Sequence, residues 1–97
     1  MFARVATVQV QVEKLDEAIE IYREGVLTAL QDVPGFEGVE LLVNRDTGHG
    51  ISITRWATEA DQLASEASGF YRAQVGKFRG LFDAMPVREV YEVAVFA

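Results

Sequence analysis

The sequence predicts an α+β domain with the element order β-α-β-β-α-β, and three observations carry this prediction. Near the amino terminus, in the middle and at the carboxyl end, apolar residues alternate with polar ones at a period of two, as in strands. Two stretches between them repeat apolar residues every three or four positions, as amphipathic helices do. Turn signals separate the stretches, among them Pro34-Gly35 and Asp46-Thr47-Gly48.

The first strand is predicted over residues 5–12, where valine alternates with threonine and glutamine. The spacing then becomes helical, and one stripe of the predicted helix comprises Leu15, Ile19, Tyr22, Val26, Leu30 and Val33. Asp16 is the predicted N-cap, because a carboxylate accepts hydrogen bonds from the free amides of the first turn. Pro34-Gly35 is predicted to end the helix and restart an extended chain.

The second half begins with two strands, predicted over residues 36–43 and 50–56 and joined through the hairpin loop Asp46-Thr47-Gly48. Thr58-Glu59-Ala60-Asp61 follows a capping box with Asp in place of the usual Glu, and it opens a helix predicted over residues 59–75. The expected apolar face of this helix comprises Leu63, Ala67, Phe70 or Tyr71, and Gln74 or Val75.

The end of the chain is less regular. Ser68-Gly69 and Gly76 are expected to weaken the far end of the second helix. A short helical piece is predicted over residues 77–84. Pro86 is then expected to release the last strand, predicted over residues 87–96.

This order predicts a ferredoxin-like, four-stranded antiparallel sheet that carries both helices on one face. The first strand, however, has apolar residues on both faces: Val5 lies on one and Ala6 and Val8 on the other. The face without helices needs a cover, and a second copy packed about a two-fold axis is the expected one. We therefore expect a homodimer.

Composition and charge limit the classes of function. The 97 residues, of which 49% are hydrophobic, suffice for a single domain over residues 1–97 with one core. A net charge of −6 with scattered Lys and Arg argues against nucleic acid or an anionic membrane as a partner. The lack of cysteine excludes disulfides and thiolate ligands, and no signal-peptide or membrane-spanning run is visible, so we expect a soluble cytoplasmic protein.

Two short motifs resemble the antibiotic biosynthesis monooxygenase domain of the dimeric α+β barrel superfamily. The first, Pro34-Gly35-Phe36-Glu37-Gly38-Val39-Glu40-Leu41-Leu42, is similar to the PGF-x-G-x-x-LL strand of that family. The second, Trp56-Ala57-Thr58-Glu59-Ala60, is similar to its tryptophan followed by a small or polar residue before helix two. The resemblance in element order covers nearly the whole chain and implies that two copies pair as a dimeric α+β barrel.

The resemblance implies two kinds of chemistry with different requirements. Haem-degrading members use an asparagine early in strand one and a tryptophan and a histidine on helix two. Here Ala6 or Thr7 stands at the first place, and residues 59–75 contain neither histidine nor tryptophan, which disfavours haem degradation. Quinone-forming members act on polycyclic phenols without metal or flavin, because the carbanion of the substrate itself reacts with oxygen. No cofactor and no metal is therefore expected.

A cavity with aromatic walls and hydrogen-bonding groups would serve the quinone-forming chemistry. The candidate substrate-binding residues are Tyr22, Trp56, Phe70, Tyr71 and Tyr91. A tyrosine supplies an apolar ring and a hydroxyl that binds a phenolate or quinone oxygen. The same positions also suit core packing, which is the favoured interpretation of each tyrosine and of Trp56. Catalytic residues are not assigned.

The only histidine, His49, and the only tryptophan, Trp56, stand at opposite ends of a predicted strand about 20 Å long, so they do not form one site within a subunit. We expect His49 to be exposed in its glycine-flanked loop. Arg55 and Arg72 are candidates for pairing with an anionic substrate, although surface pairs with Asp or Glu are favoured in so acidic a chain.

The function predicted from these observations is that of a cofactor-independent monooxygenase-like enzyme acting on a small aromatic or polyketide-like substrate. The alternative is a non-catalytic dimeric domain that binds a small hydrophobic ligand. Both need a homodimer and a cavity, and the residues alone do not separate them.

Overall fold

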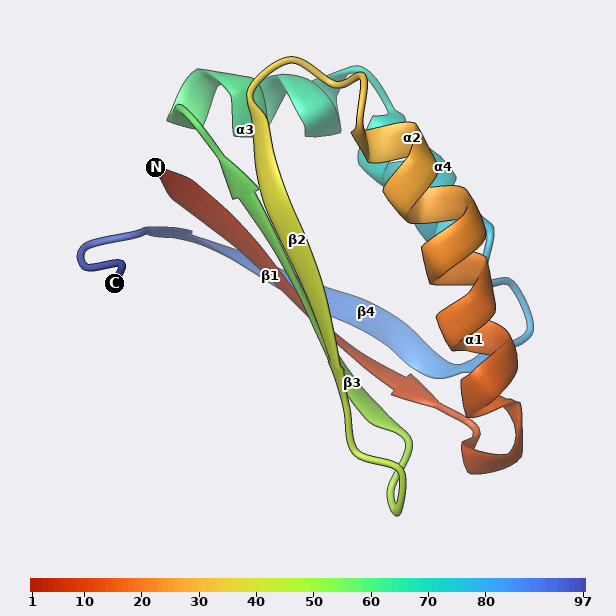
Figure 1. The fold of residues 1–97 in the computed structure, drawn as a ribbon. Helices are drawn as coiled ribbons and strands as arrows, with labels where there is room; N and C mark the ends of the chain where they lie inside the picture. Colours follow the sequence, from red (N-terminus) through yellow and green to blue (C-terminus); the bar gives the residue numbers. More distant parts are fainter.

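A computed structural model describes residues 1–97 and shows a four-stranded antiparallel sheet with all its helices on one face (Figure 1). The strands are β1 (Phe2–Val10), β2 (Phe36–Val43), β3 (His49–Trp56) and β4 (Phe82–Glu92), in the order β2-β3-β1-β4. The first helical layer comprises a 3₁₀ turn η1 (Val12–Lys14), α1 (Leu15–Ile21), a π-helical segment η2 (Tyr22–Val26) and α2 (Leu27–Leu30). The second comprises α3 (Glu59–Ala67) and α4 (Phe70–Gly76).

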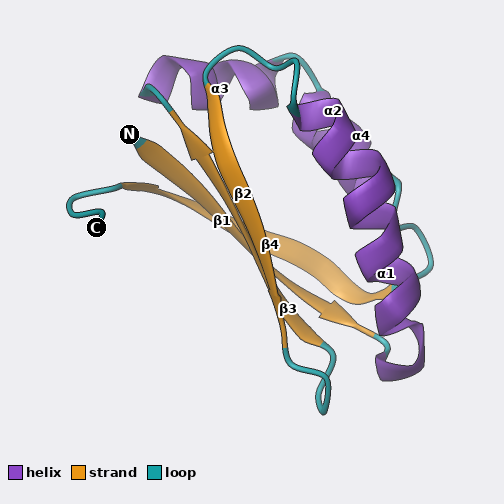
Figure 2. Cartoon of the chain, viewed as in Figure 1, coloured by secondary structure: helices purple, strands orange, loops and turns teal.

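This arrangement confirms the predicted fold class, a ferredoxin-like α+β sheet with both helical segments on one side (Figure 2). The first βα unit and the second each place a helix over the same face, and a central hairpin joins them. The bounds of β2 agree with the prediction, and β3 starts one residue earlier, at His49. None of the helices has the length and apolar character that crossing a bilayer requires.

The beginning of the chain differs from the prediction in two details. β1 starts at Phe2 rather than Val5, because Phe2 pairs with Trp56 of β3 and with Glu92 of β4. Asp16 is not the N-cap of the first helix. The cap position is Lys14, without a side-chain hydrogen bond, and the Asp16 carboxylate instead pairs with Arg45 at 3.0 Å. The 3₁₀ turn η1 feeds the chain directly into α1, so the first amides need no carboxylate cap.

The second helix is two helices rather than one over residues 59–75. Gly69 adopts the left-handed conformation, with φ 84°, and this breaks the chain between α3 and α4. Thr58 is the N-cap as predicted, since its hydroxyl accepts from the amide of Asp61. The Asp61 carboxylate accepts from this hydroxyl and not from the backbone amide of Thr58, so the capping box is only half formed.

The predicted apolar face of α3 is wrong. Its buried residues are Gln62 and Ser65, whereas Leu63 is 56% exposed and Ala67 is exposed. The inward face of α3 is polar because it packs over Arg4 of the sheet. The guanidinium of Arg4 is buried and needs polar partners, and Ser65 of α3 accepts a hydrogen bond from it.

The predicted helical piece over residues 77–84 is also wrong. Residues 77–80 form turns, and β4 begins at Phe82 because it pairs with the otherwise unpaired edge of β1. Pro86 lies inside β4 rather than before it. An edge strand tolerates this proline, and the pairing with β1 is irregular between Thr7 and Gln9. β4 ends at Glu92, so residues 93–96 lie outside the strand, contrary to the prediction.

The core lies between the sheet and the helices and comprises Val10, Leu15, Ala18, Val26, Leu30, Trp56, Phe78 and Leu81. The opposite face of the sheet carries no helix (Figure 1). Cross-strand partners define an apolar row there, which runs over Leu42, Ile51, Thr7 and Val87. Leu42 is 47% and Val87 69% exposed, so this row is open in the single chain.

The hairpin glycine Gly48 gives a test of the packing between the hairpin and β1. It has φ 79°, and a Cβ there would lie 2.0 Å from the carbonyl oxygen of Val10. We expect Gly48→Ala to lower the free energy of unfolding by about 3 kcal/mol or more, since backbone strain and a clash with main chain add together. Urea titration with linear extrapolation measures this loss.

Two glycines on the second helical layer serve as controls. Gly69→Ala adds only left-handed strain, because nothing lies near its Cβ position, and should cost about 1–2 kcal/mol. Gly76→Ala has neither strain nor a neighbour and should be neutral or slightly stabilising. Equal losses at Gly48 and Gly69 would contradict the close approach of the hairpin to Val10.

Candidate functional site

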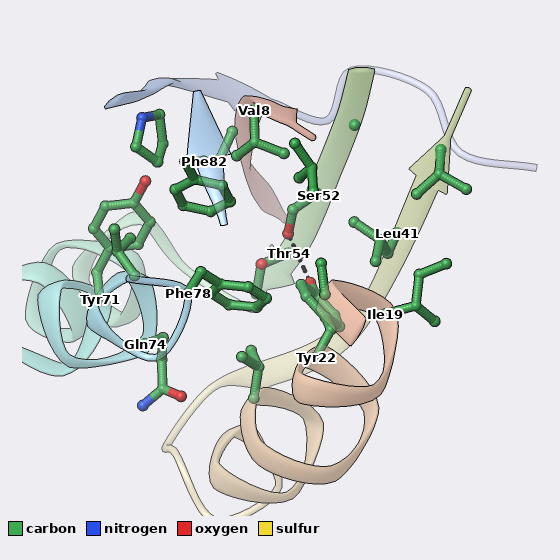
Figure 3. A pocket seen from close by; sticks show the side chains of 18 of the residues that line it. Val8, Ile19, Tyr22, Leu41, Ser52, Thr54, Tyr71, Gln74, Phe78 and Phe82 are labelled. Carbon is green, nitrogen blue, oxygen red and sulfur yellow. Dashed lines mark hydrogen bonds between the residues drawn. The ribbon is translucent and has the colours of Figure 1, made fainter. Parts of the chain in front are cut away.

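A cavity of about 90 Å³ lies between the sheet and the two helical layers. Sixteen of its 22 lining residues are hydrophobic. Figure 3 shows Tyr71 and Phe82 on one side, Ile19 and Leu41 on the other, and the hydroxyls of Ser52 and Thr54 between them. An apolar cavity with a few converging polar groups is the usual form of a small-molecule site.

The polar floor of the cavity is a pair of hydroxyls. The phenol of Tyr22 and the hydroxyl of Ser52 are 2.6 Å apart, and either oxygen can donate (Figure 3). The π-helical segment η2 begins at Tyr22, and such segments often mark functional positions in helices. Burial raises the pKa of the Tyr22 phenol, so this group stays a neutral donor near neutral pH.

A count of donors shows what the pair offers a ligand. Each hydroxyl has one proton and two acceptor sites, and the contact between Tyr22 and Ser52 uses one of the two protons. The contact leaves the second proton over, and the Thr54 hydroxyl, which also acts on the Tyr22 pKa as a hydrogen-bonding neighbour, competes for it with a ligand. The hydroxyl of Thr54, a buried neighbour on the same face of β3, adds another group to this floor. Such a floor suits a carbonyl, quinone or phenol oxygen.

The wall formed by α4 is the least fixed part of the cavity. Phe70, Tyr71, Gln74 and Val75 line the cavity, yet no residue of α4 is fully buried, and Gly69 separates this helix from α3. Pockets for drug-sized ligands usually have roughly 300–1,000 Å³. A ligand of several fused rings therefore enters only if a wall moves. Among the helical segments that line the cavity, α4 has no buried residue, whereas α1, η2 and α2 each have at least one.

One buried cation stands at the edge of this cavity. The side chain of Arg4 on β1 is 4% exposed and is the only charged group among the lining residues. Its guanidinium donates to the hydroxyl of Ser65 at 2.8 Å, lies 4.5 Å from the ring centre of Tyr71 and lies 5.5 Å from that of Trp56. Desolvation by burial lowers the pKa of Arg4, and the nearby carboxylate of Glu66 opposes that effect.

The structure brings together three of the residues predicted to bind substrate. Tyr22, Phe70 and Tyr71 line the cavity, because the helical stripe turns them toward the sheet. Trp56 is fully buried in the core and is absent from the cavity wall. Tyr91 is 48% exposed and pairs across from Ala3, which places it on the open face of the sheet.

The other candidates from the sequence lie at the surface. His49 is exposed at the start of β3, where its amide donates to the Thr47 hydroxyl. Arg55 pairs with Glu40 at 2.9 Å on the open face, as expected for a surface pair. Arg72 is exposed on α4. No group of three or more His, Asp or Glu side chains is arranged to hold a metal ion.

Three polar residues of the cavity were missed by the sequence reasoning: Arg4, Ser52 and Thr54. The signal for Ser52 and Thr54 was their alternation with Ile51 and Ile53, since only one of these two sets can face the helices. The signal for Arg4 was its register with Ala6 and Val8, which puts a cation on the covered side of the strand.

Comparison with known proteins gives a family match. The family model described as antibiotic biosynthesis monooxygenase matches residues 1–77. The chain is 36% identical over 98 residues to the uncharacterized protein Rv2557 of Mycobacterium tuberculosis, and the match covers 97% of this chain. The chain spans only 41% of the length of that relative.

Two solved structures illustrate the breadth of chemistry on this fold. A monooxygenase of Streptomyces coelicolor in complex with nanaomycin D has a TM-score of 0.73 at 20% identity, with 99% of this chain and 91% of the other covered. The heme degrader MhuD of Mycobacterium tuberculosis, with two hemes bound, has a TM-score of 0.81 at 16% identity, with 100% and 99% covered. At such low identity these likenesses establish the fold alone.

The buried indole of Trp56 gives a stability test. Its ring is 0% exposed and its N–H has no partner. We expect Trp56→Ala to lower the free energy of unfolding by about 3–5 kcal/mol, as truncation of a buried aromatic does. Trp56→Phe should cost much less, because it refills part of the space and removes an unsatisfied donor worth about 1–3 kcal/mol.

Phe96 is the matched control, because its ring is 65% exposed. Phe96→Ala removes a surface cation–π contact with Arg55, 5.2 Å away, and should change the free energy of unfolding by no more than about 1 kcal/mol in the same denaturation experiment. A Trp56→Ala variant as stable as the parent would disprove the core position of the indole.

Proposed function

Since the chain belongs to the antibiotic biosynthesis monooxygenase family, we propose that it is a cofactor-independent monooxygenase acting on a small aromatic or polyketide-like substrate. The single observation that supports this proposal most is the apolar cavity with the Tyr22–Ser52 hydroxyl pair at its floor. In the proposed complex the aromatic substrate lies against the apolar walls, and its oxygen accepts the proton that the pair leaves free.

The proposed reaction converts a ring methylene of a phenolic substrate into a quinone carbonyl. The substrate loses a proton from this carbon, and the resulting carbanion gives up electrons to dioxygen. One oxygen atom becomes the carbonyl oxygen, and the other leaves with the two methylene hydrogens as water. Hydrogen bonds to the substrate oxygen stabilise the anion that precedes the oxygen step, because they place a donor where negative charge develops.

The alternative of a non-catalytic ligand-binding domain uses the same cavity, and turnover separates the two. Haem degradation is disfavoured on residue grounds, since the only histidine lies exposed at the hairpin and lines no part of the cavity. An absorbance titration with haem tests this point. A Soret shift that saturates at one or two haems per chain would show that the chain binds haem and would contradict this argument.

We also propose that the protein works as a homodimer with the open faces of two sheets packed together. The row Leu42, Ile51, Thr7 and Val87 supports this proposal, because it leaves apolar side chains without a cover in the single chain. The charged neighbours Glu40 and Glu89 flank the next row at its two edges, which suits a polar rim around an apolar centre.

Oxygen uptake with anthrone tests the proposed activity. We expect uptake above the uncatalysed rate with quinone as product, and a loss of about two- to tenfold in kcat/KM for Tyr22→Phe, the factor that one neutral hydrogen bond gives. Tyr91→Phe removes the same hydroxyl on the open face and should keep the parental rate.

Two outcomes would contradict this prediction. Saturable anthrone binding without turnover would leave only the ligand-binding alternative. Equal effects of Tyr22→Phe and Tyr91→Phe would show that the Tyr22–Ser52 pair does not contact the substrate.

Sedimentation equilibrium tests the proposed dimer. Leu42→Asp places a carboxylate in the apolar row and should shift the protein to monomer at micromolar concentration, because an unpaired charge in an interface is costly. Leu63→Asp is the control, since Leu63 is 56% exposed, against 47% for Leu42, but lies on α3. A monomeric parent, or a Leu42→Asp variant that stays dimeric, would overturn this association.

A further inference from the structure

The buried cation Arg4 is only partly compensated by its surroundings. A guanidinium has five N–H donors, and the hydrogen bond of Arg4 to a side chain goes to a neutral acceptor, the Ser65 hydroxyl. The carboxylate of Glu66 lies 3.7 Å away, which is an ion pair without a hydrogen bond. Buried charges are normally both paired and hydrogen-bonded, so Arg4 retains capacity for an anion.

Glu66 is engaged elsewhere. Its Oε1 accepts from Nε of Arg88 at 3.0 Å and forms an ion pair with Nη2 of Arg88, also at 3.0 Å. Its Oε2 accepts from the side-chain amide of Gln62. One carboxylate therefore serves two arginines, and the group of three carries a net charge of +1 in a chain whose total charge is −6.

Tyr71 ties this charge to the cavity. Its ring lies 4.5 Å from the Arg4 guanidinium and 4.8 Å from that of Arg88, and its side chain lines the cavity in which Arg4 is the only charged group. On the other side Tyr71 borders a second hollow of about 210 Å³, whose charged lining residues are Arg72, Arg88 and Glu66. Positive charge thus stands at one end of a cavity whose other lining residues are uncharged.

We propose that Arg4 and Arg88 form an anion subsite, and that the ligand of the cavity is an aromatic acid whose carboxylate binds there. The inference rests on the proposed function in one respect, namely that the cavity binds a ligand. The rings occupy the apolar part of the cavity, Tyr71 packs against them, and the carboxylate takes the place beside Arg4 that Glu66 fills incompletely. Arg88 holds Glu66 and adds its own charge.

Calorimetric titration of the full chain with 2-naphthoate and with 2-naphthamide, a neutral probe of the same shape, tests the subsite. We expect naphthoate to bind about tenfold tighter, and Glu66→Gln to tighten naphthoate a further threefold to tenfold by removing the competing carboxylate. Arg88→Gln should weaken naphthoate by a similar factor, because it frees Glu66 to neutralise Arg4. Naphthamide should respond to neither substitution.

Glu59→Gln is the matched control, because Glu59 is exposed on the same helix and should leave both affinities unchanged. Weaker naphthoate binding in Glu66→Gln would overturn the inference and assign the cluster a structural role only. If Glu66→Gln does not fold, Arg88→Gln still tests the subsite, because the Arg88 side chain is 46% exposed and its substitution is expected to weaken naphthoate binding.

The probes also separate this inference from the proposed function. Equal affinities for naphthoate and naphthamide would overturn the anion subsite and leave the cavity as a ligand site. No binding of either probe would overturn the inference at its premise, since the cavity would then bind no aromatic ligand.

Discussion

The burial of Arg4 is the constraint on which the second helical layer depends. A guanidinium taken out of water costs several kcal/mol unless polar or aromatic groups surround it. Ser65 of α3 accepts a hydrogen bond, Tyr71 of α4 covers one side, and Trp56 of β3 lies nearby. The inward face of α3 is polar for this reason. The break at Gly69 then lets α4 change direction and bring Tyr71 over the cation.

The cavity follows from the same arrangement. α4 reaches the sheet through partly buried aromatic rings rather than through a fully buried core, so space remains between it and the first helical layer. Two polar features border that space. A neutral hydroxyl pair belongs to η2 and β3, and a cation belongs to β1, the neighbouring strand. The hydroxyl pair can donate a further hydrogen bond, and the cation lacks a fully paired anion. A ligand oxygen at either place would supply the missing partner.

Much of the fold could be predicted from the sequence because its signals are local. Periods of two and of three to four residues, with turns between them, specify the order of elements, and the helical stripe turns Tyr22 inward. Tyr91 illustrates the limit, since a shift of one residue in strand register moves a side chain to the other face. Arg4 and Ser65 illustrate another, because their contact spans 61 positions and no local pattern shows it.

The family match identifies the fold of this chain, whereas the two polar features of the cavity bear on which ligand it selects. The fold supplies a sheet, a helical cover and a space between them, and solved structures with this fold carry unlike ligands, nanaomycin D in one and two hemes in another. Selectivity must come from the side chains that line it. Here those side chains are a phenol held neutral by burial and a guanidinium short of a counter-charge. Tyr22 on η2 bonds to Ser52 on β3, and β3 is the neighbour of the strand that carries Arg4. The proposed ligand, which contacts both polar features, would therefore have a fixed orientation, with its acceptor oxygen at the hydroxyls and its acidic group at Arg4.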